Sequence, residues 1–127
     1  MVIIGHGVDI VEVARIERLI SRFPERFPRR VFTPSEIEYC FERAVPAESL
    51  AARLAAKEAV YKALSPGIEV LNWQEIEVIS GQGGRPGLKI SGKTSETADK
   101  LNITGWHISL SHERNYALAS VLAEGGR

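Results

Sequence analysis

The sequence predicts an α+β protein in which helices pack against a largely antiparallel sheet. Helical spacing dominates the first half of the chain and strand-like alternation dominates the second, and this segregation is typical of the class. The chain has 127 residues and no repeat, low-complexity tract or long linker, so we expect one domain, residues 1–127.

The first half should begin with a strand and a helix. The segment Val2 to Val13 is rich in Val and Ile, which favours a strand. Apolar residues then follow at helical spacing, namely Ile16, Leu19, Ile20, Phe23 and Phe27. Pro24 should end or bend this helix.

Two further helices are predicted from their first residues. Thr33-Pro34-Ser35-Glu36 combines a capping residue, an N-terminal proline and an acid, so a short helix should run to about Phe41. A longer helix should run from Pro46 to Leu64. We expect its core stripe to be Leu50, Leu54, Tyr61 and Leu64. We expect a second face to let a neighbouring element approach closely, because it carries Ala52, Ala56, Ala59 and Ala63.

The second half should hold most of the sheet. Alternation predicts strands near residues 74–79, 106–110 and 116–122, with a short strand at 88–90. A glycine-rich turn should occupy residues 81–87, and a helix residues 95–101.

Composition excludes several classes of protein. The 16 Lys and Arg residues balance 16 Asp and Glu residues, which argues against a surface built wholly for nucleic acid. No apolar run approaches the ~20 residues of a membrane span, and the N-terminus lacks the basic flank of a signal peptide. Cys40 is the single cysteine, so an internal disulfide and a cysteine-built zinc site are excluded. We expect a cytoplasmic protein.

An arginine stripe follows the first strand. It consists of Arg15, Arg18, Arg22 and Arg26, at positions i, i+3, i+7 and i+11. A solvated helix face would explain it, but every cation in it is the residue suited to bidentate capture of carboxylate or phosphate. We therefore favour a docking surface for an acidic protein or a polyphosphate. Nucleic acid is the weaker candidate, since few aromatic residues are interleaved.

Two acids are candidate metal ligands. Asp9 lies in an apolar strand segment, where a carboxylate must be paired, hydrogen-bonded or metal-bound. Glu58 precedes Lys62 by four residues, a spacing that also merely steadies an exposed helix. If strand and helix pack together, the two acids supply the carboxylates that Mg²⁺ takes, and Arg53, Lys57 and Lys62 supply positive charge for phosphates. A structural aspartate and an ordinary helical ion pair are the alternatives.

Polar residues near the end of the chain, among them Ser111 and His112, form a further candidate binding group. Strand alternation directs Ser111 and His112 to opposite faces, and no orienting acid is identifiable, so we disfavour a serine hydrolase. Phosphate binding suits a hydroxyl and an imidazole better, while His107 is expected to be an ordinary strand histidine. The turn at residues 83–87 either cradles a phosphate or simply joins two strands.

Three segments resemble the motifs of a known family. They are Gly7-Val8-Asp9-Ile10-Val11-Glu12, Ala55-Ala56-Lys57-Glu58-Ala59 with Lys62-Ala63-Leu64, and Ser109-Leu110-Ser111-His112. In this order they resemble the holo-acyl-carrier-protein synthases, the small single-domain branch of the 4'-phosphopantetheinyl transferases. The likeness extends from about residue 5 to residue 122. Leu54 stands where an aromatic residue is common in the family, which puts only local packing in question.

The resemblance implies Mg²⁺-dependent transfer of the 4'-phosphopantetheine arm from coenzyme A to a serine of apo acyl carrier protein, with adenosine 3',5'-bisphosphate as by-product. It implies metal ligation by Asp9 and Glu58, catalysis by these two with Lys62, and carrier docking on the arginine stripe. It also implies a homotrimer with active sites at subunit interfaces. The residues expected to bind coenzyme A are Arg53, Lys57, Lys62, Gly84, Arg85, Pro86, Ser111 and His112.

Some questions stay open at this point. The base that accepts the serine proton is either Glu58 or a metal-bound water held by Asp9. A nucleic-acid-binding module, a structural trimer and a metal-dependent nucleotide hydrolase are the rival functions. The nucleic-acid-binding module gives Asp9 and Glu58 no task, and the structural trimer does not need Lys57, Glu58 and Lys62 together. The hydrolase predicts cleavage of coenzyme A without a carrier.

Overall fold

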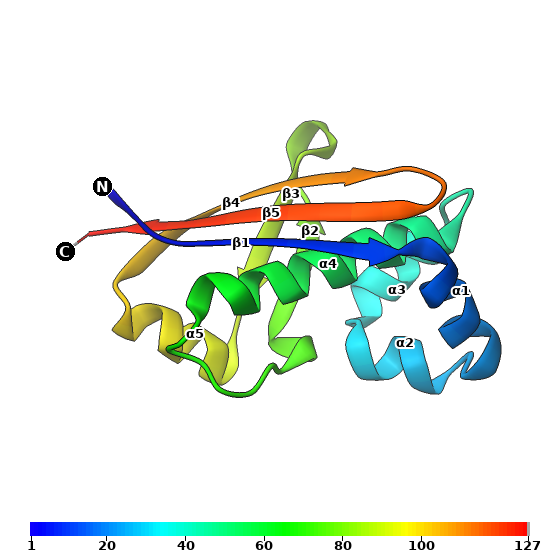
Figure 1. Cartoon of the computed structure of the whole chain (residues 1–127), viewed down its shortest axis with the longest axis horizontal. Helices are drawn as coiled ribbons and strands as arrows, with labels where there is room; N and C mark the ends of the chain where they lie inside the picture. Colours follow the sequence, from blue (N-terminus) through cyan, green and yellow to red (C-terminus); the bar gives the residue numbers. More distant parts are fainter. Residues whose placement is uncertain (127) are drawn as a thin grey trace.

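The computed structural model describes residues 1–126, with the side chain of Gln82 left aside, so the last residue of the predicted domain lies outside it. Figure 1 shows the elements in chain order. The strands are β1 (Val2–Glu12), β2 (Ile76–Ser80), β3 (Pro86–Ile90), β4 (Ile103–His112) and β5 (Tyr116–Gly125). The helices are α1 (Val13–Arg22), α2 (Arg26–Val31), α3 (Pro34–Phe41), α4 (Pro46–Leu64) and α5 (Gly92–Lys100), and short 3₁₀ turns cover Trp73–Glu75 and Gln82–Gly84.

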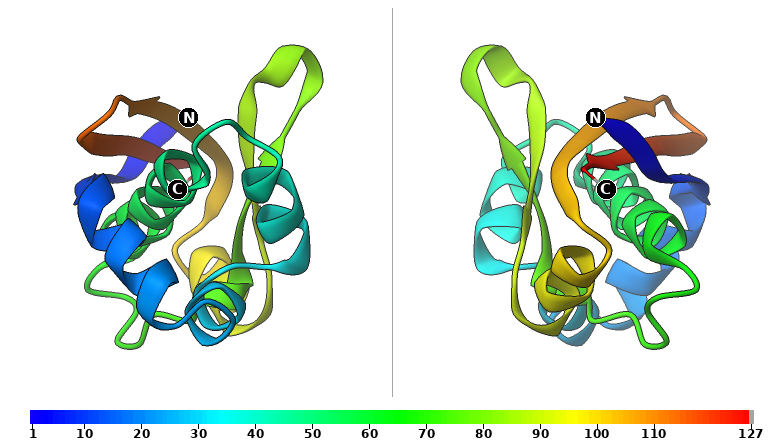
Figure 2. Two further views of the ribbon diagram at one scale, coloured as in Figure 1. Left: turned by 90° about the vertical axis from the view of Figure 1, so that its right-hand side faces the viewer. Right: turned by 90° about the vertical axis from the view of Figure 1, so that its left-hand side faces the viewer.

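The predicted α+β class and antiparallel pairing are confirmed, but the strands form two sheets. One sheet has the order β1-β5-β4, and the other is the hairpin of β2 and β3. Helix α4 crosses one face of the three-stranded sheet, and the hairpin projects on the far side of β4, as Figure 2 shows. In the described residues, no helix is long and apolar enough to cross a membrane.

Strand β1 lies directly on the alanine face of α4. A Cβ atom added to Gly7 would stand 1.8 Å from the backbone oxygen of Ala59, and one added to Gly5 would stand 2.0 Å from that of Ala63. Only glycine permits this approach. The predicted close contact is confirmed, and its consequence is that residues of β1 and α4 face each other across almost no gap.

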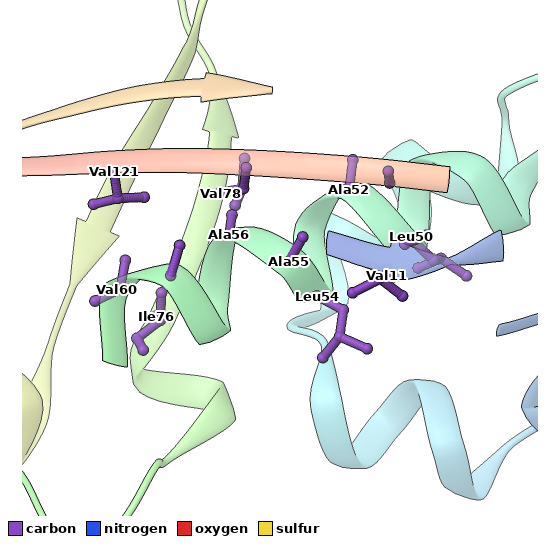
Figure 3. Close-up of a cluster of buried hydrophobic side chains, with 14 of the residues drawn as sticks. Val11, Leu50, Ala52, Leu54, Ala55, Ala56, Val60, Ile76, Val78 and Val121 are labelled. Carbon is purple, nitrogen blue, oxygen red and sulfur yellow. The ribbon is translucent and has the colours of Figure 1, made fainter. Parts of the chain in front are cut away.

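The core fills the space around α4 on nearly every side. Figure 3 shows Val11, Val121 and Ile76 contributing to it from three different strands. Leu50, Leu54 and Leu64 are buried as predicted, whereas Tyr61 is only partly buried and donates its hydroxyl hydrogen to the backbone oxygen of Glu69 at 3.1 Å.

Several element boundaries differ from the prediction. Helix α1 ends at Arg22, before Pro24, and a separate short helix, α2, follows it. Helix α5 begins at Gly92 rather than near residue 95, because the carboxylate of Glu75 caps it from a distant segment. Its oxygens accept hydrogen bonds from the backbone nitrogens of Lys93 at 3.2 Å and Thr94 at 3.0 Å. Strands β4 and β5 are longer than expected.

Candidate active site

An acid pair, Asp9 of β1 and Glu58 of α4, forms where strand and helix touch. Lys62, one turn after Glu58, donates to Asp9 Oδ1 at 3.0 Å and to the backbone oxygen of Val8 at 3.0 Å. The structure therefore brings together the three residues expected to carry catalysis. The Gly7–Ala59 contact fixes their separation, because Gly7 and Ala59 are near neighbours of Asp9 and Glu58 in the chain.

The acid pair places two carboxylates beside each other in a partly buried setting. Burial, together with a hydrogen bond to Asp9 and its charge, raises the pKa of Glu58 to about 7, although Arg15 and Lys62 oppose this shift. Asp9 Oδ2 is buried and has no hydrogen-bond partner among the described residues. A buried carboxylate oxygen without a partner is costly, and a bound cation would relieve that cost.

The donor set fits Mg²⁺ rather than a metal held wholly by protein. The described residues contain no group of three or more His, Cys, Asp or Glu side chains able to enclose a metal. Mg²⁺ typically takes one or two carboxylates and fills its other positions with water and substrate phosphate oxygens. Asp9 and Glu58 provide that number, and Lys62 lies beside them.

A separate cleft of about 380 Å³ opens between α3, the first half of α4, the hairpin and the end of β4. Two guanidinium groups lie against the Tyr39 ring in this cleft, Arg43 at 4.4 Å and Arg53 at 4.3 Å from its centroid. Arg53 is 6% exposed, and its Nε has no hydrogen-bond partner among the described residues. Such a site suits an anion with an aromatic or planar part.

The cleft gathers half of the residues expected to bind coenzyme A. Arg53, Gly84, Pro86 and His112 line it. Gly84 adopts a φ of 76°, which glycine allows readily and which opens the turn at the tip of the hairpin.

Three other residues expected to bind coenzyme A lie elsewhere. Arg85 is exposed on the hairpin and is not among the residues lining the cleft. Ser111 is exposed on the outer face of the sheet, opposite Leu118, because successive residues of β4 point to opposite faces. Lys57 is in the core, with its side chain 0% exposed.

The expectation that Lys57 binds coenzyme A is therefore not supported by its position. Its Nζ lies 2.8 Å from Glu36 Oε1 and donates to the backbone oxygens of Trp73, at 2.9 Å, and Ile76. These three partners use all three ammonium hydrogens. Burial lowers the pKa of Lys57, and the Glu36 carboxylate opposes that shift. Lys57 joins α4 to α3 and β2, and has no hydrogen left for a phosphate.

The acid pair and the cleft lie at opposite edges of the three-stranded sheet. Asp9 is on β1, His112 is on β4, and β5 separates the two strands. Glu58 follows Arg53 by five residues on α4, which turns the two side chains about 140° apart. The expected catalytic and coenzyme-binding residues therefore form two part-sites within one chain.

The arginine stripe divides between two helices. Arg15 lies near enough to Glu58 to lower its pKa, and Arg18 lies 3.5 Å from Glu12. Arg26 belongs to α2, where it lines a hollow of about 230 Å³ with Phe23, Phe27 and Arg30. All four arginines are exposed, so the surface presents cations beside aromatic carbon.

The outer face of the sheet carries exposed apolar side chains on β1 and β5. Val8 and Ile10 of β1 are 44% and 59% exposed, and Tyr116 and Leu118 of β5 are 49% and 39% exposed. In the strand register, Ile10 lies opposite Leu118. Adjacent exposed apolar side chains of this kind mark an interaction surface.

Sequence reasoning missed several residues of the cleft, namely Tyr39, Arg43, Glu48, Ser49 and Ser80. One signal was available, because Ser49 precedes Arg53 by four residues and so shares its helix face. Nothing local marked Tyr39, Arg43 or Ser80. His107, expected to be an ordinary strand histidine, lies 2.8 Å from Glu124 and outside the cleft.

Comparisons with known proteins agree on one family. Residues 5–121 match the family model described as the 4'-phosphopantetheinyl transferase superfamily. A holo-[acyl-carrier-protein] synthase of Koribacter versatilis is 46% identical over 123 residues, covering 96% of this chain and 98% of that protein. One of Moorella thermoacetica is 48% identical over 118 residues, covering 93% of this chain and 91% of that protein.

Solved structures of this family have the same fold as this chain. The holo-[acyl-carrier-protein] synthase of Neisseria meningitidis has a TM-score of 0.87 at 34% identity, covering 97% of this chain and 99% of that one. The Helicobacter pylori synthase, solved in complex with coenzyme A, has a TM-score of 0.81 at 35% identity, covering 94% of this chain and 99% of that one.

Proposed function

The chain belongs to the 4'-phosphopantetheinyl transferase superfamily, and on that premise we propose how it transfers the 4'-phosphopantetheine arm from coenzyme A to apo acyl carrier protein. The observation that carries the proposal is the acid pair, in which Asp9 Oδ2 is buried without a partner beside Glu58 and Lys62. Asp9 and Glu58 would hold Mg²⁺, which when bound supplies positive charge to the pyrophosphate.

The residues around the acid pair have defined tasks in the transfer. Lys62 offsets charge on the pyrophosphate, and Asp9 holds Lys62 in place. The carrier serine oxygen forms a bond to the phosphorus that bears the pantetheine arm, while the bond from that phosphorus to the bridging oxygen breaks. Adenosine 3',5'-bisphosphate leaves with the bond's electrons. Glu58, the half-buried carboxylate beside Asp9, would accept the serine proton.

A second copy of the chain would complete the site. The acid pair and the cleft lie at opposite edges of one sheet, and the sheet carries an exposed apolar face around Ile10 and Leu118. If that face packs against another copy, the cleft of one chain can meet the acid pair of the next. Cyclic assembly of three chains would then give three equivalent sites.

The arginine stripe is the proposed docking surface for the acidic carrier. Arg15 lies closest to the acid pair, so a carrier bound along α1 would bring its serine toward Glu58.

Fractionation of cells producing the protein would test the cytoplasmic location that we propose from the single, buried thiol of Cys40.

The central experiment weighs the carrier protein. Apo carrier incubated with coenzyme A, Mg²⁺ and this protein should gain the mass of the phosphopantetheine arm. Glu58→Gln should abolish the gain, while Glu96→Gln, which changes an exposed acid on α5, should leave it intact. Near-normal transfer by the Glu58→Gln variant would contradict the proposal, and coenzyme A cleavage without a carrier would favour the hydrolase.

The docking surface has its own test. Arg22→Glu should raise the KM for the carrier, and the effect should shrink at high salt because exposed charges are screened beyond ~8–10 Å. Lys100→Glu makes the same charge change on α5 and should leave that KM unchanged. Unchanged carrier binding by Arg22→Glu at low salt would refute the docking role.

A further inference from the structure

An acid stands inside the cleft that we assign to coenzyme A. Glu48 lines it together with the cations Arg43 and Arg53. Coenzyme A carries several phosphate charges, and a free carboxylate beside them would weaken binding by repulsion. A Glu48 carboxylate in this cleft must therefore be held by a partner that offsets its charge.

The carboxylate of Glu48 is not free, because His112 binds it. Glu48 Oε1 lies 3.0 Å from His112 Nδ1, and this contact joins the start of α4 to the end of β4, 64 residues away in the sequence. Since a carboxylate only accepts, Nδ1 carries the hydrogen and donates it. Among the described hydrogen bonds, this is the one that engages the His112 ring, so Nε2 is the nitrogen left for a ligand.

Both ends of the contact are placed by backbone structure. Glu48 lies in the first turn of α4, where its backbone nitrogen donates to the Val45 oxygen at 3.1 Å and the helix dipole favours a negative side chain. His112 ends β4 just before a turn that Glu113 closes by accepting hydrogen bonds from the backbone of Asn115 and Tyr116.

The bond to Glu48 restricts the side-chain rotamers of His112. The His112 side chain is 43% exposed, and an exposed imidazole without a partner samples several rotamers. The bond to Glu48 selects one rotamer, and in the ring with a hydrogen on both nitrogens Nδ1 donates to Glu48 while Nε2 is free to donate to a phosphate.

We propose that Glu48 is a positioning residue that acts through His112: it accepts the Nδ1 hydrogen and so presents Nε2 of the imidazole to a phosphate of coenzyme A in the cleft. This role rests on the proposed function of the cleft. It adds to that function a residue that acts through His112 and determines how tightly coenzyme A is held.

The experiment compares four proteins: wild type, Glu48→Ala, His112→Ala and the double variant. Coenzyme A binding is measured by calorimetry and transfer by steady-state kinetics. Loss of one charge-assisted hydrogen bond should weaken coenzyme A binding about tenfold in Glu48→Ala. The KM for coenzyme A should rise equally, while kcat and the KM for the carrier should hold. Glu48→Gln, which can still accept from Nδ1, should recover part of the loss.

The double variant separates positioning from other roles. If Glu48 acts through His112, removing Glu48 from the His112→Ala protein should change coenzyme A affinity by less than twofold. A purely electrostatic Glu48 would make Glu48→Ala bind coenzyme A more tightly, and a merely structural one would weaken binding equally in both backgrounds. Either result overturns the proposal.

One control variant completes the design. Glu38→Ala removes an exposed acid from α3, outside the cleft, and should leave coenzyme A binding unchanged. Wild-type protein that fails to bind coenzyme A would overturn the proposed function of the cleft and, with it, the role of Glu48. Wild-type binding matched by Glu48→Ala would overturn the role of Glu48 alone.

Discussion

A single methyl group added at Gly7 should damage both the fold and the acid pair. The new Cβ in Gly7→Ala would stand 1.8 Å from the backbone oxygen of Ala59 and 2.7 Å from its carbonyl carbon. Neither atom can rotate away as a flexible side chain does. Gly7 has no positive φ, so the damage comes from this collision and not from backbone strain.

The size of the effect follows from the distance. Ordinary contact begins at 3.4 Å, so β1 and α4 would have to separate locally by about 1.6 Å. Overpacking of this kind typically costs ~1–3 kcal/mol, and we expect about 3 kcal/mol because both partners are backbone. The separation also moves Asp9 away from Glu58, so binding of Mg²⁺ should weaken at least about tenfold, since ligand geometry decides Mg²⁺ affinity.

Urea unfolding and Mg²⁺ calorimetry measure the two effects on the same protein. Gly87→Ala is the matched control, because its Cβ would stand 3.4 Å from the Ile79 side chain, in ordinary contact. Its unfolding free energy should change by less than about 0.5 kcal/mol. If Gly7→Ala unfolds at the same urea concentration as wild type and binds Mg²⁺ equally, the argument from close packing is wrong.

Three further predictions follow from burial and charge. Lys57→Met should lower the unfolding free energy by ~3–5 kcal/mol, because it leaves the Glu36 carboxylate buried without its cation. In urea titrations, the double variant that also carries Glu36→Gln should regain part of this loss. Additive losses from the two substitutions would contradict the pairing. The pKa of Glu58 is raised in the folded chain, so its own contribution to the stability of the metal-free protein should be fully present below pH 4.5 and lost as the pH rises through about 7. A full shift would be worth about 3 kcal/mol, of which about half is expected for a half-buried carboxyl, and Glu58→Gln should abolish this pH dependence in urea titrations. Finally, residues 1–127 should unfold in one cooperative transition by calorimetry, and two separated transitions would contradict the single-domain prediction.

The helix and strand types were largely predictable because their causes are local. Pro46 and the Ser65-Pro66-Gly67 sequence bound α4 at the predicted residues, and the Thr33–Glu36 capping box starts α3 as expected. The start of α5 was not predictable in the same way. Its cap is the Glu75 carboxylate, which the folding of the chain brings from outside the helix.

The acid pair was predictable for a different reason. A carboxylate in an apolar strand and a carboxylate followed by a lysine are both visible in sequence. Their proximity was conditional on the packing of strand and helix, which the structure shows through the glycines of β1 and the alanines of α4. The role of Lys57 was not predictable. Helix α4 is surrounded by protein on most sides, so helical periodicity could not tell whether Lys57 faces the core or the solvent.

The sequence by itself determined the class of fold and most of the elements, because periodicity, caps and residue chemistry act over a few positions. Only the tertiary structure decided which charged side chains are paired inside the core and which line the acid pair and the cleft. It buried Lys57 against Glu36, placed Arg53 against Tyr39 and Glu58 beside Asp9, and joined Glu48 to His112. Each of these depends on burial or on contacts between distant segments, and the local pattern of a chain carries no record of either.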